Sequence, residues 1–321
     1  MIPDHYTLMA IKDLSLAARR TIDGFMAGIN KSKVRGPGLE FSQYRSYQPG
    51  DDLRWLDWKR YARTDRYYIR ESEVETSISV RLMIDASLSM NHRDEGSRHG
   101  GDEGAGSGAD EGSRHGGDET GGRRAFTKIE YARYLAAALG WLAHGQGDAL
   151  GLYVFRDGTV HVLPARQDTQ HLARFMHQLE GVRPEGKMGQ PIEYKHIFFG
   201  EQKRELLIFI TDLYERDGEI SGLLELLASL RHEIVVFHIM GRNELEKDFG
   251  TYTEVEDWET GERVAVSPGV DAAYMERMKG WLSGMRMRLL DKQIAYQLMR
   301  MDQPVDQALR NFLQLRQQIK G

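Results

Sequence analysis

Residues 77–89, SISVRLMIDASLS, decide the fold of this chain. Up to Ile84, apolar residues alternate with others, a pattern that is typical of a β-strand buried on at least one face. Three later runs, at 149–155, 206–211 and 234–239, are short, almost continuously apolar and rich in β-branched or aromatic residues. Such runs predict further strands of a parallel sheet that is covered on both faces.

Helical patterns lie between these predicted strands. Apolar residues within 132–142 recur at i, i+3, i+4 and i+7, and Thr127 with Glu130 forms a capping box at the start of that helix. Two more helices are predicted, at 172–179 and 220–230. The regular alternation of strand and helix predicts an α/β fold with a mostly parallel sheet flanked by helices.

We expect two parts in the chain. Residues 1–75 form an N-terminal extension, helical at first and irregular afterwards, and residues 76–321 form the α/β domain. One local hairpin is expected to turn at Asp157-Gly158. The tail is expected to form, in order, a hairpin at 253–266, a helix at 272–290, a short strand at 294–298 and a closing helix at 305–319.

Residues 91–122 form a low-complexity insertion of Gly, Asp, Glu, Ser, Arg and His, in which the decamer DEGSRHGGDE occurs twice, at 94–103 and 110–119. The insertion carries almost no apolar side chains, so it cannot offset the entropic cost of ordering its backbone. We therefore expect a disordered, mobile loop.

Composition limits the function classes. The chain of 321 residues contains no cysteine, so any metal ligands are oxygen or histidine. Its net charge of -5 gives no overall attraction to nucleic acid or to anionic membranes. No apolar run approaches the roughly 18–20 residues that cross a bilayer, and no signal peptide pattern begins the chain, which predicts a cytoplasmic protein without a membrane span.

A polar cluster follows the first predicted strand. Asp85, Ser87 and Ser89 form a D-x-S-x-S pattern at the strand end, and Asp212 directly follows the apolar strand at 206–211. Ligand sites on open α/β sheets favour the edge where parallel strands end. Two hydroxyls and two carboxylates suit a hard divalent cation, Mg²⁺ or Mn²⁺, which prefers oxygen ligands. The alternative is a strand-end turn in which Asp85 and the serines bond the local backbone.

The same pattern resembles the metal-ion-dependent adhesion site of von Willebrand factor A domains. A longer likeness is carried by residues 36–63, GPGLEFSQYRSYQPGDDLRWLDWKRYAR, which resemble the signature of the family called domain of unknown function fifty-eight. The segments at 252–266 and 308–316 are similar to that family as well, so the resemblance covers nearly the whole chain. It implies a von Willebrand factor A-like, Rossmann-like fold.

The resemblance also implies a role. It indicates a non-enzymatic, metal-assisted interaction module that works with a MoxR-type AAA+ ATPase in chaperone-like assembly or activation of client proteins. In the adhesion-site scheme, a partner carboxylate completes the coordination of the ion, and a Thr from the loop after the 172–179 helix is a further ligand. That loop reads GKMGQPIEY here, at 186–194, so Gln190 is the candidate ligand in place of Thr, with Glu193 or a water as alternatives.

Arginine and aromatic residues are interleaved between Tyr44 and Arg70. From this block we select six candidate partner-binding residues: Arg45, Arg54, Trp55, Asp57, Trp58 and Arg63. Arg and Trp are favoured at interface hot spots, which supports docking of an acidic protein partner. Two alternatives remain: binding of single-stranded nucleic acid, which the interspersed aspartates oppose, and a structural clamp of the N-terminal region onto the core.

The rival function class is a metal-dependent hydrolase or nuclease that would use Asp85 and Asp212 with His144 or His238. Neither histidine stands in a recognisable motif, and His238 falls inside an apolar predicted strand, where a core role is more common. No Gly-x-x-x-x-Gly-Lys-Ser/Thr motif is present, so ATP hydrolysis is expected from a partner. We therefore expect an interaction module without catalytic activity of its own.

Overall fold

A computed structural model describes residues 13–31, 43–46, 61, 63–64, 66–71, 78–94, 126–198, 204–246, 254–257, 259–265, 272–307 and 309–310. At its centre lies a six-stranded sheet in the order β12-β9-β8-β3-β6-β7. In chain order these strands are β3 (Ser79–Asp85), β6 (Ala149–Arg156), β7 (Thr159–Arg166), β8 (Leu206–Thr211), β9 (Glu233–Met240) and β12 (Ala295–Arg300). Renumbered within the sheet they run 6-5-4-1-2-3, which is the doubly wound order of open α/β sheets.

Every neighbouring pair in this sheet is parallel except β6 with β7. These two strands are joined by Asp157 and Gly158, whose φ values of 46° and 67° are both positive, as a type I′ hairpin turn requires. The predicted hairpin is therefore confirmed. The predicted α/β fold, von Willebrand factor A-like with a mostly parallel sheet flanked by helices, is confirmed as well.

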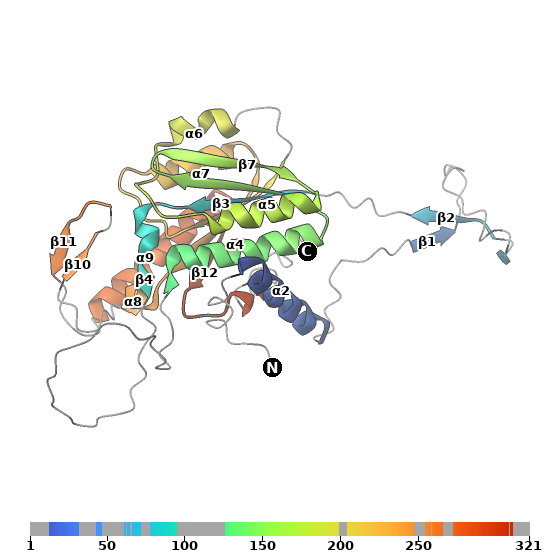
Figure 1. The fold of residues 1–321 in the computed structure, drawn as a ribbon, viewed down its shortest axis with the longest axis horizontal. Coiled ribbons are helices and arrows are strands. Elements are labelled where there is room, and N and C mark those ends of the chain that lie inside the picture. Colours follow the sequence, from blue (N-terminus) through green and yellow to red (C-terminus); the bar gives the residue numbers. More distant parts are fainter. Residues whose placement is uncertain are drawn as a thin grey trace, which may run out of the picture.

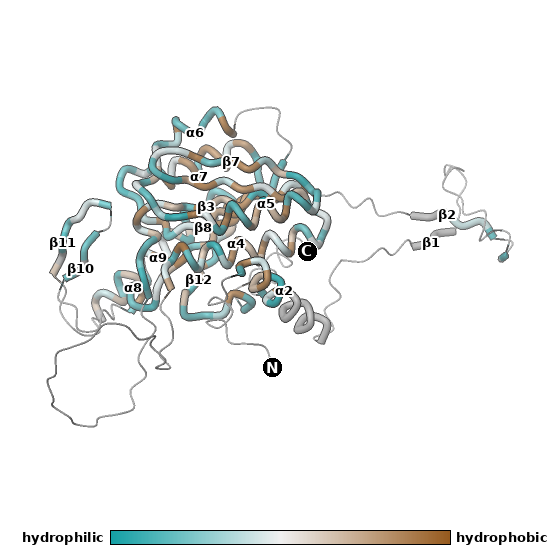
Figure 2. The backbone as a smooth tube through the Cα atoms, viewed as in Figure 1, coloured by the Kyte–Doolittle hydropathy of each residue, from teal (hydrophilic) through white to brown (hydrophobic). Residues whose placement is uncertain are grey.

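Helices cover both faces of the sheet (Figure 1). One face carries α4 (Lys128–Gly145) and α5 (Thr169–Glu180), and the other carries α6 (Pro191–Phe198), α7 (Glu219–Ser229) and α9 (Ala272–Asp291). Successive side chains of a strand point to opposite faces. Leu82 and Ile84 of β3 therefore join the core under α4 and α5, whereas Met83 joins the core under the other three helices. Figure 2 shows apolar residues concentrated along the sheet.

The predicted capping box at the start of α4 is present. The hydroxyl of Thr127 accepts a hydrogen bond from the backbone N–H of Glu130 at 3.3 Å, and Glu130 Oε2 accepts one from the backbone N–H of Thr127 at 2.9 Å. Because this reciprocal pair satisfies two backbone donors of the first turn, it fixes where α4 begins.

The N-terminal helix α2 (Leu14–Lys31) packs against α4. Ala17 and Ala18 are buried there, and the hydroxyl of Thr21 hydrogen-bonds the hydroxyl of Tyr134. The expectation of an initial helix is thus confirmed from Leu14 onward. Two short antiparallel strands follow, β1 (Gln43–Ser46) and β2 (Tyr68–Glu71). The domain boundary at residue 75 stays a prediction.

Two short strands flank the low-complexity insertion. β4 (Arg93–Asp94) pairs antiparallel with β5 (Phe126–Thr127), and a 3-10 helix, η2 (Leu88–Asn91), precedes β4. Regular structure therefore continues past residue 91, where the insertion was predicted to start. The reason is that β4 pairs with β5, which lies on the other side of the insertion in the sequence. Residues 95–125 lie outside the described residues, and so does the expectation of a mobile loop.

The tail follows the predicted order of elements. After β9 come α8 (Arg242–Glu246), the hairpin of β10 (Glu254–Glu256) with β11 (Arg263–Ala265), α9 and β12. Of the predicted closing helix at 305–319, only 305–307 and 309–310 are described, and these residues are helical. None of the described helices combines the length and the apolar character needed to cross a bilayer.

Candidate functional site

Asp85 ends β3 and is fully buried at the edge where the parallel strands end. Its Oδ1 accepts hydrogen bonds from the backbone N–H of Ser87 at 3.0 Å and from the Ser87 hydroxyl at 2.7 Å. Its Oδ2 accepts a hydrogen bond from the Thr211 hydroxyl at 2.7 Å. The first bond is the local turn that the sequence allowed as an alternative, and the last joins a second strand to the same carboxylate.

Ser87, Ser89 and Asp212 continue this network. Ser87 Oγ lies 3.0 Å from Ser89 Oγ, and Ser89 Oγ donates to Asp212 Oδ1 at 3.2 Å. Ser87 directly precedes η2 and Ser89 lies within it, so this tight turn brings both hydroxyls back to the strand edge. The structure thus places four of the five predicted metal ligands together, and their binding of a metal stays a prediction.

Lys128 provides a fixed positive charge beside Asp212. It is the first residue of α4, and its side chain is 5% exposed. Its ammonium contacts Asp212 Oδ2 at 2.9 Å and Glu244 Oε1 at 2.7 Å. Glu244 belongs to α8, where its other carboxylate oxygen accepts a hydrogen bond from the backbone N–H of Gly241 at 2.8 Å. One oxygen of Asp212 therefore faces the hydroxyls and the other faces an ammonium.

Burial and neighbouring charges make the two aspartates differ. Burial raises the pKa of Asp85 to about 6, and the charge of Asp212 adds to this rise, while hydrogen bonds from Ser87 and Thr211 oppose it. Burial also acts against ionisation of Asp212, but the attraction of Lys128 outweighs it and holds the pKa of Asp212 below its ordinary value. Asp212 is therefore a paired anion at neutral pH, whereas ionised Asp85 is costly and would be stabilised by a cation.

The β10–β11 hairpin brings two further carboxyl groups, those of Asp257 and Glu259, toward this edge (Figure 1). The carboxylate of Asp257 accepts hydrogen bonds from the Tyr214 hydroxyl and, at 3.2 Å, from Arg216, which fastens the hairpin turn to the loop after β8. Burial raises the pKa of the half-buried Glu259 to about 7, and the charges of the two site aspartates add to this rise. Glu259 therefore lies in the electrostatic field of the site.

Gln190, the fifth predicted ligand, is not part of this network. It lies just before α6 with its side chain exposed, and its backbone N–H donates to Glu193 Oε2 at 3.0 Å. Among the hydrogen bonds of the described residues, none joins Gln190 or Glu193 to the two site aspartates. The structure instead supplies a third hydroxyl from Thr211, on the strand next to β3.

Of the two histidines named for the rival hydrolase class, His144 lies far from the site, whereas His238 is buried in the sheet beside Asp212. His144 stands sixteen residues beyond Lys128 on α4, or about 24 Å along the helix at about 1.5 Å per residue. His238 is buried in β9, where Nδ1 lies 2.8 Å from the Tyr296 hydroxyl and burial lowers its pKa to about 4. The described part of the chain contains no group of three or more His, Asp or Glu side chains that could hold a metal ion. His238 thus fits the core role better than a catalytic one.

The Arg and aromatic block is described only in part. Arg45 lies in β1, opposite Ile69 of β2, and Arg63 is exposed. The other four candidate partner-binding residues lie outside the described residues: Arg54, Trp55, Asp57 and Trp58. Docking of an acidic partner, nucleic-acid binding and a structural clamp therefore all stay predictions.

The donor set fits a hard divalent cation. It consists of oxygen atoms from two carboxylates and three hydroxyls: Asp85, Asp212, Ser87, Ser89 and Thr211. An ionised carboxylate has about four lone-pair sites, and Asp85 accepts three hydrogen bonds. Each hydroxyl that donates a proton also keeps lone pairs for an ion. Mg²⁺ suits such a site, since it binds one or two carboxylates and keeps several waters.

Three residues at this edge were missed by the sequence prediction. Thr211 could have been found, because it immediately precedes Asp212 at a strand end and carries a hydroxyl. Lys128 could have been found as well, because a cation in the first turn of a helix opposes the helix dipole and so marks an unusual position. Glu244 has no comparable local signal, since only the fold brings α8 to α4.

Comparisons with known proteins find distant relatives and similar solved structures. The uncharacterized protein Rv1480 of Mycobacterium tuberculosis is 25% identical over 249 residues, which cover 76% of this chain and 68% of that protein. Among solved structures, the chain is similar to BatB from Bacteroides thetaiotaomicron, with 15% identity, a TM-score of 0.44 and coverage of 76% of this chain and 100% of that one. It is also similar to the SpRpn10 VWA domain, with 9% identity, a TM-score of 0.36 and coverage of 74% and 95%.

The family itself is given by a match to the model described as Protein of unknown function DUF58. This match extends over residues 43–99 and 114–279. It includes residues 43–63 of the 36–63 signature, the Asp85 turn and the strand that ends before Asp212. Because it covers more than half of the sequence, the chain belongs to the DUF58 family.

Proposed function

We propose that this protein is an interaction module that binds Mg²⁺ or Mn²⁺ at the carboxyl edge of its sheet and captures a carboxylate of a protein partner through that ion. The observation that carries the proposal is the continuous network from Asp85 through Ser87 and Ser89 to Asp212. These oxygen donors come from two strands and one turn. They therefore converge on one place without any change of fold.

The charge balance at this edge supports capture of an acidic partner. Lys128 already offsets part of the negative charge of Asp212 and Glu244, so Asp85 is the main anionic ligand left for an ion. A divalent cation held mainly by one free carboxylate keeps a net positive charge. Charge-assisted contacts to a partner's Asp or Glu would then add affinity.

We extend the proposal to the partner system, a MoxR-type AAA+ ATPase in chaperone-like assembly or activation of client proteins. The support for this extension is the resemblance of residues 36–63 to the family signature. Co-purification of the full chain with an ATPase of this class from the native host tests it. Recovery of that ATPase should fall with Asp85→Ala. Equal recovery with the native chain and with Asp85→Ala would contradict a role for the ion site in binding the ATPase.

Isothermal titration calorimetry tests the ion itself. We expect saturable heat when Mg²⁺ or Mn²⁺ is added to the native chain and none with Asp85→Ala, because that variant lacks the carboxylate at the centre of the network. Asp291→Ala, exposed at the end of α9, is the matched control and should bind the ion like the native chain. Circular dichroism checks that both variants keep the fold. Equal heats for the native chain and Asp85→Ala would refute the ion site.

A further inference from the structure

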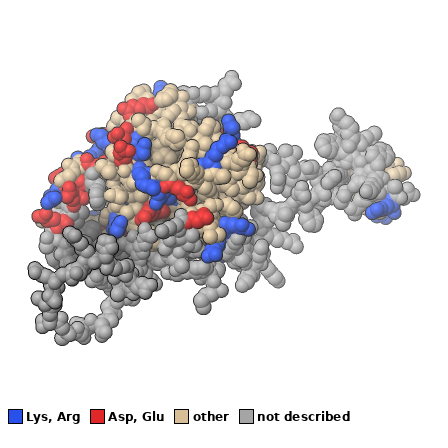
Figure 3. Space-filling model, in the orientation of Figure 1, with Lys and Arg blue, Asp and Glu red and all other residues tan. Residues whose placement is uncertain are grey.

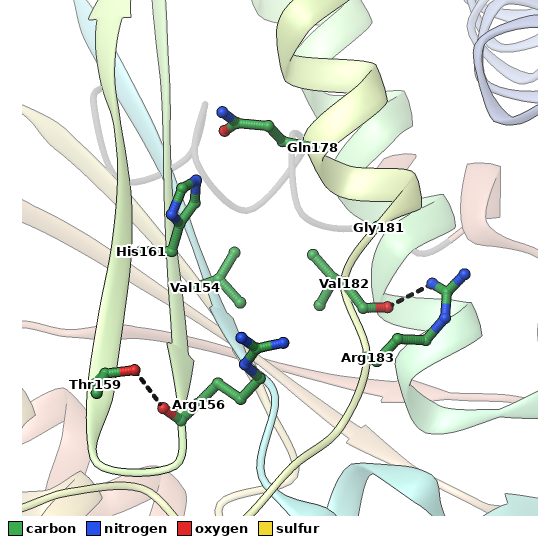
Figure 4. Close-up of a pocket in the computed structure, with 8 residues that line it drawn as sticks. All are labelled: Val154, Arg156, Thr159, His161, Gln178, Gly181, Val182 and Arg183. Carbon is green, nitrogen blue, oxygen red and sulfur yellow. Dashed lines mark hydrogen bonds between the residues drawn. The ribbon is translucent and has the colours of Figure 1, made fainter.

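A groove of about 220 Å³ opens between the β6–β7 hairpin and the C-terminal end of α5 (Figure 4). Arg156 and His161 line it from the hairpin, and Gln178 and Arg183 line it from α5 and the segment after that helix. The apolar side chain of Val182 lies between these two sides. We name this feature the arginine groove.

A third arginine, Arg133, lies beside Arg183 and adds to the positive charge at the groove. Arg133 Nη1, from α4, donates to the backbone carbonyls of Glu180 at 3.1 Å and Val182 at 3.4 Å. Arg183 Nη1 donates to the same two carbonyls, at 2.6 and 2.8 Å. Two guanidiniums are thus held together by neutral acceptors at the end of α5. Because each guanidinium has five N–H donors, both have donors left for an anionic ligand.

Arg156, on the opposite side, is held only weakly. Its Nε lies 3.4 Å from Glu185 Oε2, and the two side chains are 47% and 60% exposed. Exposed ion pairs of this kind contribute about 0–1 kcal/mol. An incoming carboxylate can therefore replace Glu185 at little cost.

The arginine groove borders the proposed ion site. Phe155 pairs with Asp85 between β6 and β3, so Arg156 stands one residue beyond the register of Asp85. The backbone N–H of Glu185 donates to the carbonyl of Ala86 at 2.9 Å. The segment that forms the rim of the groove therefore also contacts the turn that holds the site.

We propose that the arginine groove receives an acidic side chain, Asp or Glu, of the same protein partner whose carboxylate completes the ion site. This inference rests on the proposed function. A guanidinium can bind a carboxylate through two parallel N–H···O bonds, and Figure 4 shows the Arg156 guanidinium directed into the groove. The Arg183 guanidinium is turned toward the carbonyl of Val182 and adds positive charge at the other side. The partner would present two acidic residues, one for the ion and one for the groove.

Charge complementarity favours an acidic polypeptide over a nucleic acid. Glu180 and Glu185 flank the arginines, and Figure 3 shows Asp and Glu interspersed with Lys and Arg over the described residues on the face in view. A nucleic-acid backbone presents a series of phosphates and needs an extended positive surface. A single carboxylate needs one guanidinium fork.

Fluorescence anisotropy of a fluorescein-labelled hexaglutamate peptide tests the inference on the full chain with Mg²⁺ present. Replacing Arg156 and Arg183 together by Ala should weaken peptide binding by about tenfold or more, since the guanidinium that enters the groove and the positive charge beside it are both lost. Arg166→Ala, exposed at the other end of β7, is the matched control and should leave affinity unchanged. Glu185→Gln should strengthen binding, because it removes the acid that competes for Arg156. Such a gain cannot result from misfolding.

The remaining possible results distinguish a failure of this inference from a failure of the proposed function. Absence of peptide binding to the native chain, or unchanged binding to the double variant, would overturn the groove and leave ion binding by Asp85 to its own test. Stronger binding of a labelled oligothymidylate than of the peptide, lost in the double variant, would overturn it in favour of nucleic acid. If chelation of Mg²⁺ and Asp85→Ala leave peptide binding unchanged while the double variant weakens it, the groove is supported and ion bridging fails.

Discussion

At the residue scale, Lys128 is buried at the start of α4 with its ammonium between Asp212 and Glu244. A cation in the first turn of a helix is opposed by the helix dipole, by about 0.3–1 kcal/mol at exposed positions. Burial of an ammonium costs more still. The two carboxylates offset both costs, so the position of Lys128 is explained by the charge that it brings to the site and not by helix propensity.

Lys128→Met should lower the free energy of unfolding by about 3–5 kcal/mol, the usual cost of removing one partner from a buried ion pair. Methionine keeps an apolar side chain of similar length but leaves both carboxylates without their cation. Urea denaturation followed by circular dichroism measures the change. Lys279→Met, exposed on α9, should stay within about 0.5 kcal/mol of the native chain. If Lys128→Met lowers the free energy of unfolding by no more than Lys279→Met does, the buried ammonium is not needed for stability.

Sequence distance explains which site residues could be predicted. Asp85, Ser87 and Ser89 lie within five positions, so their spacing alone indicated a shared site. Asp212 was found because parallel strands end at one edge of a sheet. The contacts of Lys128 with Asp212 and Glu244 span 84 and 116 positions, and that of Thr211 with Asp85 spans 126. Such contacts depend on the packing of whole elements, which a local pattern does not encode.

At the element scale, the β10–β11 hairpin should respond to pH through Glu259. Its pKa in the fold is raised from 4.5 to about 7, so the fold favours the neutral acid. That contribution to stability is complete below pH 4.5 and is lost as the pH rises through about 7. Glu259→Gln is neutral at every pH. It should therefore melt about 2 °C or more above the native chain at alkaline pH, and close to it at pH 4.5.

Thermal unfolding in the presence of a chelator measures this difference without competition from a bound ion. The control is Glu262→Gln in the same hairpin, where the side chain is 70% exposed. Its melting temperature relative to the native chain should not depend on pH. If both variants respond to pH alike, neither burial nor the charges of Asp85 and Asp212 raise the pKa of Glu259.

The elements that were predicted well are those whose formation depends on residues that are neighbours in the sequence. Alternating or continuous apolar runs gave the strands, the capping box at Thr127 gave the start of α4, and Asp157-Gly158 gave the hairpin turn. The role expected of Gln190 had no such basis, because it depended on the path of a loop. That loop ends where Glu193 accepts a hydrogen bond from the backbone of Gln190, so the segment turns into α6.

At the scale of the whole molecule, ion binding should raise the stability of the fold, because the site joins β3, η2 and β8. A ligand that binds only the folded state adds about 2.7 kcal/mol at a hundred times its Kd. For a chain of 321 residues, that is a rise in Tm of about 4 °C. Differential scanning calorimetry with Mg²⁺ or with chelator measures it, and K⁺ at equal ionic strength controls for screening. A rise of equal size in Asp85→Ala would place the ion elsewhere.

The helix α4 is covered by segments from distant parts of the sequence. Ala17 of α2 and, much later, Val305 and Leu309 are buried in the same core, and the Tyr131 hydroxyl donates to the carbonyl of Gln303 at 3.4 Å. While the ribosome is still making the chain, this helix therefore keeps part of its apolar surface open to water and to chaperones. Its burial is complete only after residue 309 has left the exit tunnel, so the packing of this helix is finished late in the synthesis of residues 1–309.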